Sequence, residues 1–199
     1  MKAKFPLFQS HLDLVYSYWQ KLVQTGDTII DATCGNGLDT LKLAQLCLGK
    51  EKGWLYAIDI LPKAIDLTQT HLRNMLDETI LQRVRFVEGC HSNFPEEIQP
   101  ESVKLIVYNL GYLPGGGDKT RTTMLETTLE SVEKGMTLIQ PGGAISLTLY
   151  PGHPEGRREE ENIISFAKEL DPLLWNCCHH QWPNRQKSPS LLLLQRKLP

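Results

Sequence analysis

Asp31-Ala-Thr-Cys-Gly35-Asn-Gly37 is the stretch that decides the fold, because the short apolar run Thr28-Ile-Ile leads into it and a helical run over 38–48 follows it. A buried strand that ends in a glycine turn and opens a helix is typical of the first unit of an α/β domain. Gly35 and Gly37 let the backbone bend sharply and approach a ligand without a Cβ. Alone, the stretch predicts either a tight strand-to-helix turn or a nucleotide-like binding loop.

The same alternation of strands and helices continues on both sides of this loop. Upstream, apolar side chains share one face of a predicted helix over about 10–24, with Ser10 as its N-cap. Downstream, strands are expected at 54–58, 84–88, 103–108 and 144–150, and helices from Pro62, over 122–139 and over 158–170. Strands near 173–180 and 191–195 are expected to be antiparallel neighbours, and Pro141–Gly143 is expected to be a turn. The order predicts an α/β fold, a mainly parallel sheet with helices on both faces.

Composition predicts one domain and excludes some classes of function. The 199 residues, 41% of them hydrophobic, are expected to form a single domain over 1–199, with a donor-binding half at about 27–109 and an acceptor half at about 110–199. A net charge of −2 gives no global positive field. Five cysteines without a CxxC pair predict reduced thiols. With no apolar run of about 20 residues, we expect a cytoplasmic protein without a membrane span.

Two of the strand-to-helix loops favour one ligand, since ligands bind beyond the carboxyl ends of parallel strands. A dinucleotide-binding fingerprint would have a third glycine where Thr40 stands, and it would not need Asp31. An acidic residue beside the turn suits a cation, such as the ammonium of S-adenosylmethionine, better than a pyrophosphate. Asp59 lies 22 residues beyond Gly37, where a carboxylate can accept both ribose hydroxyls; alternatively it caps the helix at Pro62.

The third loop, Gly89-Cys90-His91-Ser92, is expected at the level of the adenine ring. His91 then either reads the edge of the base or is a packing histidine, and the spacing leaves both interpretations open. Cys177-Cys178-His179-His180 looks like a metal-ligating set, but adjacent side chains on a strand point to opposite faces. We therefore predict no metal site.

The fourth loop, 108–119, carries the candidate acceptor site. Asn109 and Tyr112 repeat the logic of the Asn-Pro-Pro-Tyr loop of methyltransferases that act on planar amino groups. The Asn oxygen accepts a hydrogen bond from the amine, and Tyr112 offers an aromatic face for a base. The alternative is a glycine-rich connection with a core tyrosine. After the fifth strand, His153 and Glu155 are candidates to take a proton from an ammonium, and a structural turn with a capping Glu is the alternative.

Five segments carry a family resemblance: DATCGNGLDT (31–40), YAIDI (56–60), YNLGYLPGGGDK (108–119), PGG (141–143) and YPGHPEGRRE (150–159). In these the chain resembles the bacterial putative rRNA-methylase family, the MnmM (YtqB) group. The resemblance implies a Rossmann-like class I methyltransferase fold with a seven-stranded sheet. It also implies N-methylation of the 5-aminomethyl group of 2-thiouridine at the tRNA wobble position. The chain departs from the family at Leu61, often Gln, at Cys90, often Ser, and over 183–190.

The resemblance places Asn36, Gly37, Asp59, Leu61, Cys90 and His91 at donor-binding positions. With the loop residues, the predicted donor set is Asp31, Gly35, Asn36, Gly37, Asp39, Thr40, Asp59, Leu61, Cys90, His91 and Asn109. The predicted catalytic set is Asn109, Tyr112, His153 and Glu155. The predicted substrate-binding set is Tyr112, Gly115, Gly116, Asp118, Lys119, His153 and Arg185.

The expected cofactor is S-adenosyl-L-methionine, with S-adenosyl-L-homocysteine as its product. The expected partner is the anticodon stem-loop of tRNA, and a homodimer is a further expectation because one small domain offers little surface to an RNA. Two alternatives stay open: an rRNA or small-molecule methyltransferase on the same scaffold, and a module that binds the donor without catalysis.

Overall fold

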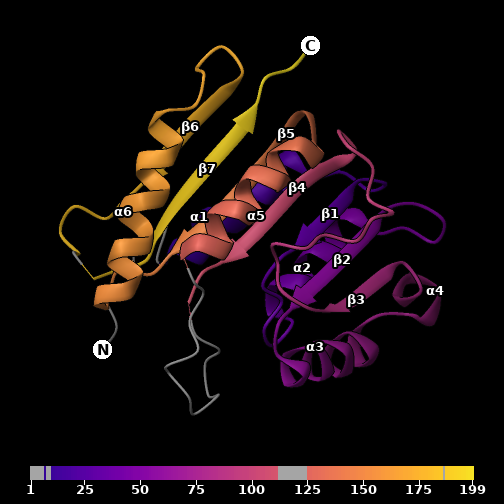
Figure 1. The fold of residues 1–199 in the computed structure, drawn as a ribbon. Helices are drawn as coiled ribbons and strands as arrows, with labels where there is room; N and C mark the ends of the chain where they lie inside the picture. Colours follow the sequence, from indigo (N-terminus) through magenta and orange to yellow (C-terminus); the bar gives the residue numbers. More distant parts are fainter. Residues whose placement is uncertain (1–6, 8–9, 112–124, 186) are drawn as a thin grey trace.

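The computed structural model describes residues 7, 10–111, 125–185 and 187–199, in which seven strands form one sheet of order β3-β2-β1-β4-β5-β7-β6 (Figure 1). The strands are β1 Thr28–Asp31, β2 Trp54–Asp59, β3 Val84–Glu88, β4 Val103–Asn109, β5 Ile139–Leu149, β6 Trp175–His180 and β7 Ser190–Arg196. Strands β1 to β5 pair in parallel, and β7 is antiparallel to both β5 and β6. The predicted mainly parallel sheet and the antiparallel last pair are confirmed.

Helices cover both faces of the sheet. They are α1 His11–Leu22, α2 Leu38–Cys47, α3 Pro62–Met75, α4 Glu78–Leu81, α5 Leu125–Leu138 and α6 Pro154–Lys168. Helices α1, α2 and α3 pack on the face that carries Ile29, whereas α5 and α6 pack on the face that carries Ile30. In Figure 1, α5 and α6 lie in front of the sheet and α1 lies behind it. Successive residues of β1 therefore enter two different cores, which explains its uninterrupted apolar sequence.

Helix α1 is tied to the second half of the sheet. Ser10 and Asp13 form a capping box at its start, as the Ser10 N-cap predicts. The Trp19 indole is 1% exposed and donates from Nε1 to Ser146 Oγ of β5 at 3.1 Å. The Tyr18 hydroxyl lies 3.0 Å from His180 Nε2 of β6. These contacts fix α1, near the N-terminus, to strands from the C-terminal part of the chain.

The predicted turn at Pro141–Gly143 is wrong, because these residues form a bulge inside β5. The ladder pairs Val103 with Ile139 and then Leu105 with Ala144, so β5 advances five residues while β4 advances two. Gly142 has φ +73°, its carbonyl accepts from Lys104 Nζ at 3.1 Å, and its N–H donates to the Lys197 carbonyl at 3.2 Å. These partners let the strand continue through the glycines.

Two boundaries also differ from the sequence prediction. Helix α6 begins at Pro154, not at 158, because His153 caps it. Strand β6 begins at Trp175, since the Asp171 carbonyl accepts the N–H groups of Leu174 and Trp175 in a turn. The short helix α4 was not predicted. The predicted start of α5 at 122 falls outside the described residues.

In the part of the chain that the structure describes, no helix is both long and apolar enough to span a membrane. All five cysteines are free thiols, as expected. The single-domain boundary and the cytoplasmic location stay predictions.

Candidate functional site

The first loop, at Gly35–Gly37, lies so close to α3 that a side chain at Gly37 would collide with it. Gly35 and Gly37 have φ of +55° and +80°, and Gly37 is the N-cap of α2. A Cβ at Gly37 would lie 2.9 Å from Thr68 Cα, and Thr68 Oγ1 donates to the Gly35 carbonyl at 3.2 Å. The two glycines therefore allow α2 and α3 to meet at the turn, and the Gly35 N–H donates to Asp59 at the end of β2.

Asp31 braces this loop from inside. It is 1% exposed, and its oxygens accept from Thr40 Oγ1 at 2.7 Å and from the Thr33 N–H at 3.3 Å. Burial raises the pKa of Asp31 to about 7, against the lowering effect of the Thr40 hydrogen bond. The Thr40 hydroxyl thus donates a hydrogen bond to Asp31 that a third glycine could not make. Direct contact between Asp31 and a ligand stays a prediction.

We expect Asp31→Asn to make stability less sensitive to pH. The folded-state pKa of about 7 exceeds the ordinary 3.8, so the native protein loses stability as pH rises between these values. Relative to wild type, the variant should gain about 4 kcal/mol in unfolding free energy between pH 4 and pH 8, at about 1.4 kcal/mol for each of the roughly three pKa units. Urea denaturation across that range measures it, with exposed Asp66→Asn as the matched control. An unchanged difference at every pH would contradict the expectation.

Asp59 links the first and second loops. Its Oδ2 accepts from the Gly35 N–H and its Oδ1 from the Leu61 N–H, both at 3.0 Å. The alternative that Asp59 caps the next helix is wrong, since the N-cap of α3 is Leu61. Burial raises the pKa of Asp59, and hydrogen bonds from the backbone N–H groups of Leu61, Gly35 and Ile60 oppose this rise. A carboxylate has about four acceptor positions, so Asp59 remains able to accept a ribose hydroxyl.

His91 at the third loop packs in the core. Its ring is 9% exposed and meets Tyr108 edge-on at 5.9 Å, and its carbonyl accepts from Ser131 Oγ at 2.6 Å. Burial lowers the pKa of His91 to about 4, so the ring is neutral. Its Nδ1 is buried without a hydrogen-bond partner among the described residues. Cys90 Sγ lies 3.3 Å from Ser92 Oγ beside it. The packing interpretation is favoured for the ring, and the neighbouring backbone remains the candidate to face adenine.

Asn109 lies at the switch in strand order, between β1 and β4. Its N–H donates to Thr33 Oγ1 at 2.7 Å, and its Nδ2 donates to Asp39 Oδ2 at 3.0 Å. Asp39 Oδ1 accepts from the Tyr16 hydroxyl at 2.6 Å. Because a carboxylate only accepts, these contacts fix which end of the Asn109 amide carries the oxygen. Asp39, predicted to bind the donor, is therefore engaged with the candidate acceptor residue.

Comparison with known proteins identifies the family. Residues 55–196 match the model of the family described as Putative rRNA methylase. The chain belongs to this family. It is 37% identical over 190 residues to the Arabidopsis thaliana protein named tRNA (mnm(5)s(2)U34)-methyltransferase, chloroplastic, an alignment that covers 93% of this chain and 69% of the relative.

Solved structures agree with the family and the fold. A putative rRNA-methylase from Clostridium thermocellum is 34% identical, with a TM-score of 0.87 over 95% of this chain and 98% of that one. A putative methyltransferase from Streptococcus mutans, solved in complex with SAH, has a TM-score of 0.81 at 23% identity, over 95% and 99% of the two chains. The second likeness supports the fold alone. The predicted class I methyltransferase fold is confirmed.

His153 and Glu155 occupy a helix start in this family member. His153 is the N-cap of α6, where its Nδ1 accepts from the Gly156 N–H at 3.1 Å. Glu155 Oε2 lies 3.3 Å from the same Nδ1, and the Glu155 side chain is 72% exposed. The capping alternative is therefore favoured, with His153 as the cap in place of Glu155. Their predicted role as proton acceptors has no supporting contact with Asn109 among the described residues.

Most of the other residues predicted to bind the acceptor cannot be placed. Tyr112, Gly115, Gly116, Asp118 and Lys119 lie outside the described residues, so their roles stay predictions. Arg185 follows β6, and its guanidinium lies 5.6 Å from the centre of the Trp182 ring. That stacking orients the side chain without joining it to Asn109.

Sequence reasoning missed four residues around Asn109. Thr33 and Tyr150 contact Asn109 itself. Tyr16 and His11 contact its partners Asp39 and Tyr150. The Tyr150 hydroxyl lies 3.4 Å from His11 Nε2, and a Cβ at Gly111 would lie 3.4 Å from the Tyr150 ring. Tyr150 follows directly after β5, which was the one local signal, because ligand sites gather at strand ends. His11 and Tyr16 carry no such signal, since only the docking of α1 brings them here.

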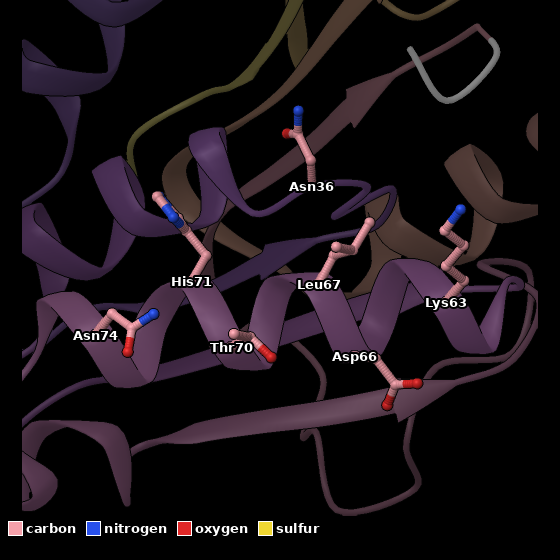
Figure 2. A pocket seen from close by; sticks show the side chains of 7 residues that line it. All are labelled: Asn36, Lys63, Asp66, Leu67, Thr70, His71 and Asn74. Atoms are coloured by element: carbon pink, nitrogen blue, oxygen red, sulfur yellow. The ribbon is translucent and has the colours of Figure 1, made fainter. Parts of the chain in front are cut away.

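A hollow of about 400 Å³ lies along the outer face of α3 (Figure 2). It is lined by Asn36, Lys63, Asp66, Leu67, Thr70, His71 and Asn74. Apart from Asn36, none of these is a predicted donor residue. The hollow therefore borders the donor loop from outside and is distinct from the surface at Asn109.

Proposed function

We propose that this chain is an S-adenosylmethionine-dependent methyltransferase that N-methylates the 5-aminomethyl group of 2-thiouridine at the tRNA wobble position. Membership of the family and 37% identity to a relative named for this tRNA methyl transfer support the proposal. The single observation that carries it is the oriented Asn109 amide, placed beside the donor loops at the switch in strand order.

The residues present fit the methyl donor. Asp59 lies across from the Gly35 turn and presents carboxylate lone pairs for a ribose, while the exposed Ile60 beside it offers an apolar surface for a base. The buried His91 Nδ1 without a partner marks a polar atom at the predicted adenine level. When bound, S-adenosylmethionine supplies a methyl group on a sulfonium, which an amine lone pair attacks in line.

The chain contributes orientation to that reaction. Asn109 Oδ1, positioned by the bond from Nδ2 to Asp39, accepts a hydrogen bond from the acceptor amine and so aims the amine lone pair toward the donor. The Thr33 hydroxyl holds the Asn109 backbone in the same frame. Holding the two reacting atoms in line supplies much of the acceleration of a displacement.

Methylation of tRNA in vitro tests the proposal. The purified chain, S-adenosylmethionine and tRNA that carries the unmethylated 5-aminomethyl-2-thiouridine should yield the methylaminomethyl nucleoside, identified by mass spectrometry after digestion. Transcripts without the aminomethyl group are the negative control. Equal product from those transcripts would contradict the wobble assignment. The family description names rRNA, so deproteinised rRNA forms a second arm, and methylation there alone would replace the tRNA substrate by rRNA.

Binding of the anticodon stem-loop, a homodimer and a cytoplasmic location belong to the same proposal. The relative's name places that protein in the chloroplast, so location does not follow from the family. Salt-dependent binding of a stem-loop probe and sedimentation of the free protein address the first two.

A further inference from the structure

We infer that Tyr150 and His11 form a proton relay that deprotonates the acceptor ammonium, with His11 Nε2 as the final proton acceptor. The inference rests on the proposed amine methylation. An alkylammonium has no lone pair for attack, so the site needs a base beside the acceptor. The two residues come from β5's end and from α1, a helix outside the span 55–196 that the family model matches.

The geometry places the pair against Asn109. The Tyr150 hydroxyl lies 3.4 Å from His11 Nε2, and the two rings meet edge-on with centres 5.8 Å apart and an interplanar angle of 84°. Burial raises the pKa of Tyr150, and a hydrogen bond with the Asn109 side chain opposes that rise. One phenol oxygen therefore contacts the residue that orients the amine and also the imidazole behind it.

Neighbouring groups serve this role less well. His153 Nδ1 is committed to the Gly156 N–H, and Glu155 is exposed on the first turn of α6. Asp39 holds the Tyr16 hydroxyl and the Asn109 amide, and a carboxylate is ordinarily a far weaker base than an imidazole. Asp39 instead supplies negative charge that favours a cationic acceptor.

The protonation states suit a relay. Burial is the main cause that lowers the pKa of His11, while the charges of Asp39 on α2 and Asp13 on α1 act in the opposite direction. His11 is therefore neutral and able to accept a proton at neutral pH. Burial, reinforced by Asp39, raises the pKa of Tyr150 to about 12, so the hydroxyl keeps its proton until the transfer.

The step balances. The ammonium gives one proton to the Tyr150 oxygen as the Tyr150 hydroxyl gives its own proton to His11 Nε2. Tyr150 is unchanged, His11 becomes an imidazolium, and the substrate becomes a neutral amine. Its lone pair then forms the N–C bond as the C–S bond breaks and that bond's electrons remain on sulfur.

The chain offers a matched control. The Tyr18 hydroxyl and His180 Nε2 form a second Tyr–His pair at 3.0 Å, which also involves α1 but faces β6. Tyr18→Phe and His180→Asn remove a comparable contact without touching Asn109. These variants therefore measure how far a weaker attachment of α1 to the sheet by itself changes the rate of methyl transfer.

Single-turnover methyl transfer from pH 5.5 to 9.5, with saturating donor and tRNA, tests the inference. We expect Tyr150→Phe and His11→Asn to lower the rate at pH 7.5 about 100-fold, the lower end for a lost general base. Their rates should then climb about tenfold per pH unit as free amine accumulates, whereas wild type levels off above the pKa of His11. The control variants should stay within about threefold of wild type. Wild-type-like rates, or a loss equal at every pH, would overturn the inference.

Two readouts separate this inference from the proposed function. Titration of the His11 Cε1–H signal by NMR should give a pKa below 6.5 in wild type and in Tyr18→Phe; a pKa above 7 would overturn the base assignment without any activity. Calorimetry should give donor affinities within threefold for all variants. An inactive wild type would instead refute the proposed function, and the relay with it.

Discussion

Gly37→Ala should lower the free energy of unfolding by about 3 kcal/mol and weaken binding of the methyl donor at least tenfold. The left-handed backbone at φ +80° costs a residue with a Cβ about 1–2 kcal/mol. The added carbon would also lie 2.9 Å from Thr68 Cα, so α2 and α3 have to separate, which adds about 1–3 kcal/mol. Because this movement distorts the turn at Gly35, affinity falls together with stability.

Urea denaturation and calorimetry with S-adenosylmethionine measure both effects. Gly26→Ala is the matched control, since Gly26 also has a positive φ, +112°, but a Cβ there meets only Lys52 Cβ at 3.8 Å. The control should cost about 1 kcal/mol and leave donor affinity unchanged. Equal losses in the two variants would show that strain, and not the approach of α3, determines the effect.

Asn109→Ala should lower the rate of methyl transfer about 100- to 1,000-fold while donor affinity changes less than threefold. Loss of one oriented hydrogen-bonding group at a reacting centre typically has this effect. The backbone N–H of residue 109 still reaches Thr33 Oγ1, so the end of β4 should keep its position. Single-turnover kinetics with tRNA and calorimetry with the donor provide the two measurements.

Asn162→Ala is the matched control for Asn109. Asn162 lies on the exposed side of α6, where its Nδ2 donates to the Arg158 carbonyl at 2.7 Å. Its replacement should leave the rate within twofold of wild type. Full methyl transfer by Asn109→Ala would remove Asn109 from the catalytic machinery.

Much of the fold could be predicted from local sequence patterns. Short apolar runs separated by segments of helical periodicity were enough to predict the parallel strands. The short spacing between the last two strands was enough to predict their antiparallel pairing. The bulge at Gly142 was missed because Pro-Gly-Gly ordinarily indicates a turn. Its strand character depends on Lys104 and Lys197, partners distant in sequence.

The candidate site likewise combines residues that local sequence predicts with contacts between distant residues that it does not predict. The glycine turn was predictable because Gly35, Gly37 and Asp31 lie within one strand-turn-helix unit. Asp39 was assigned to the donor because it shares that loop, yet its contacts lie with Asn109, 70 positions away, and Tyr16, 23 positions away. His11 and Tyr150 are 139 positions apart. Such contacts depend on how α1 docks, which no periodicity encodes.

The strand order also dictates when the molecule can finish folding on the ribosome. Among the described residues, strand β6 pairs only with β7, and β7 lies between β5 and β6 although it is synthesised after both. Until Ser190–Arg196 leaves the exit tunnel, β5 therefore presents an unpaired edge and Trp175–His180 has no strand to join. Because α1 contacts both β5 and β6, this helix, which carries Tyr16 and His11, can dock fully only after that edge of the sheet is closed.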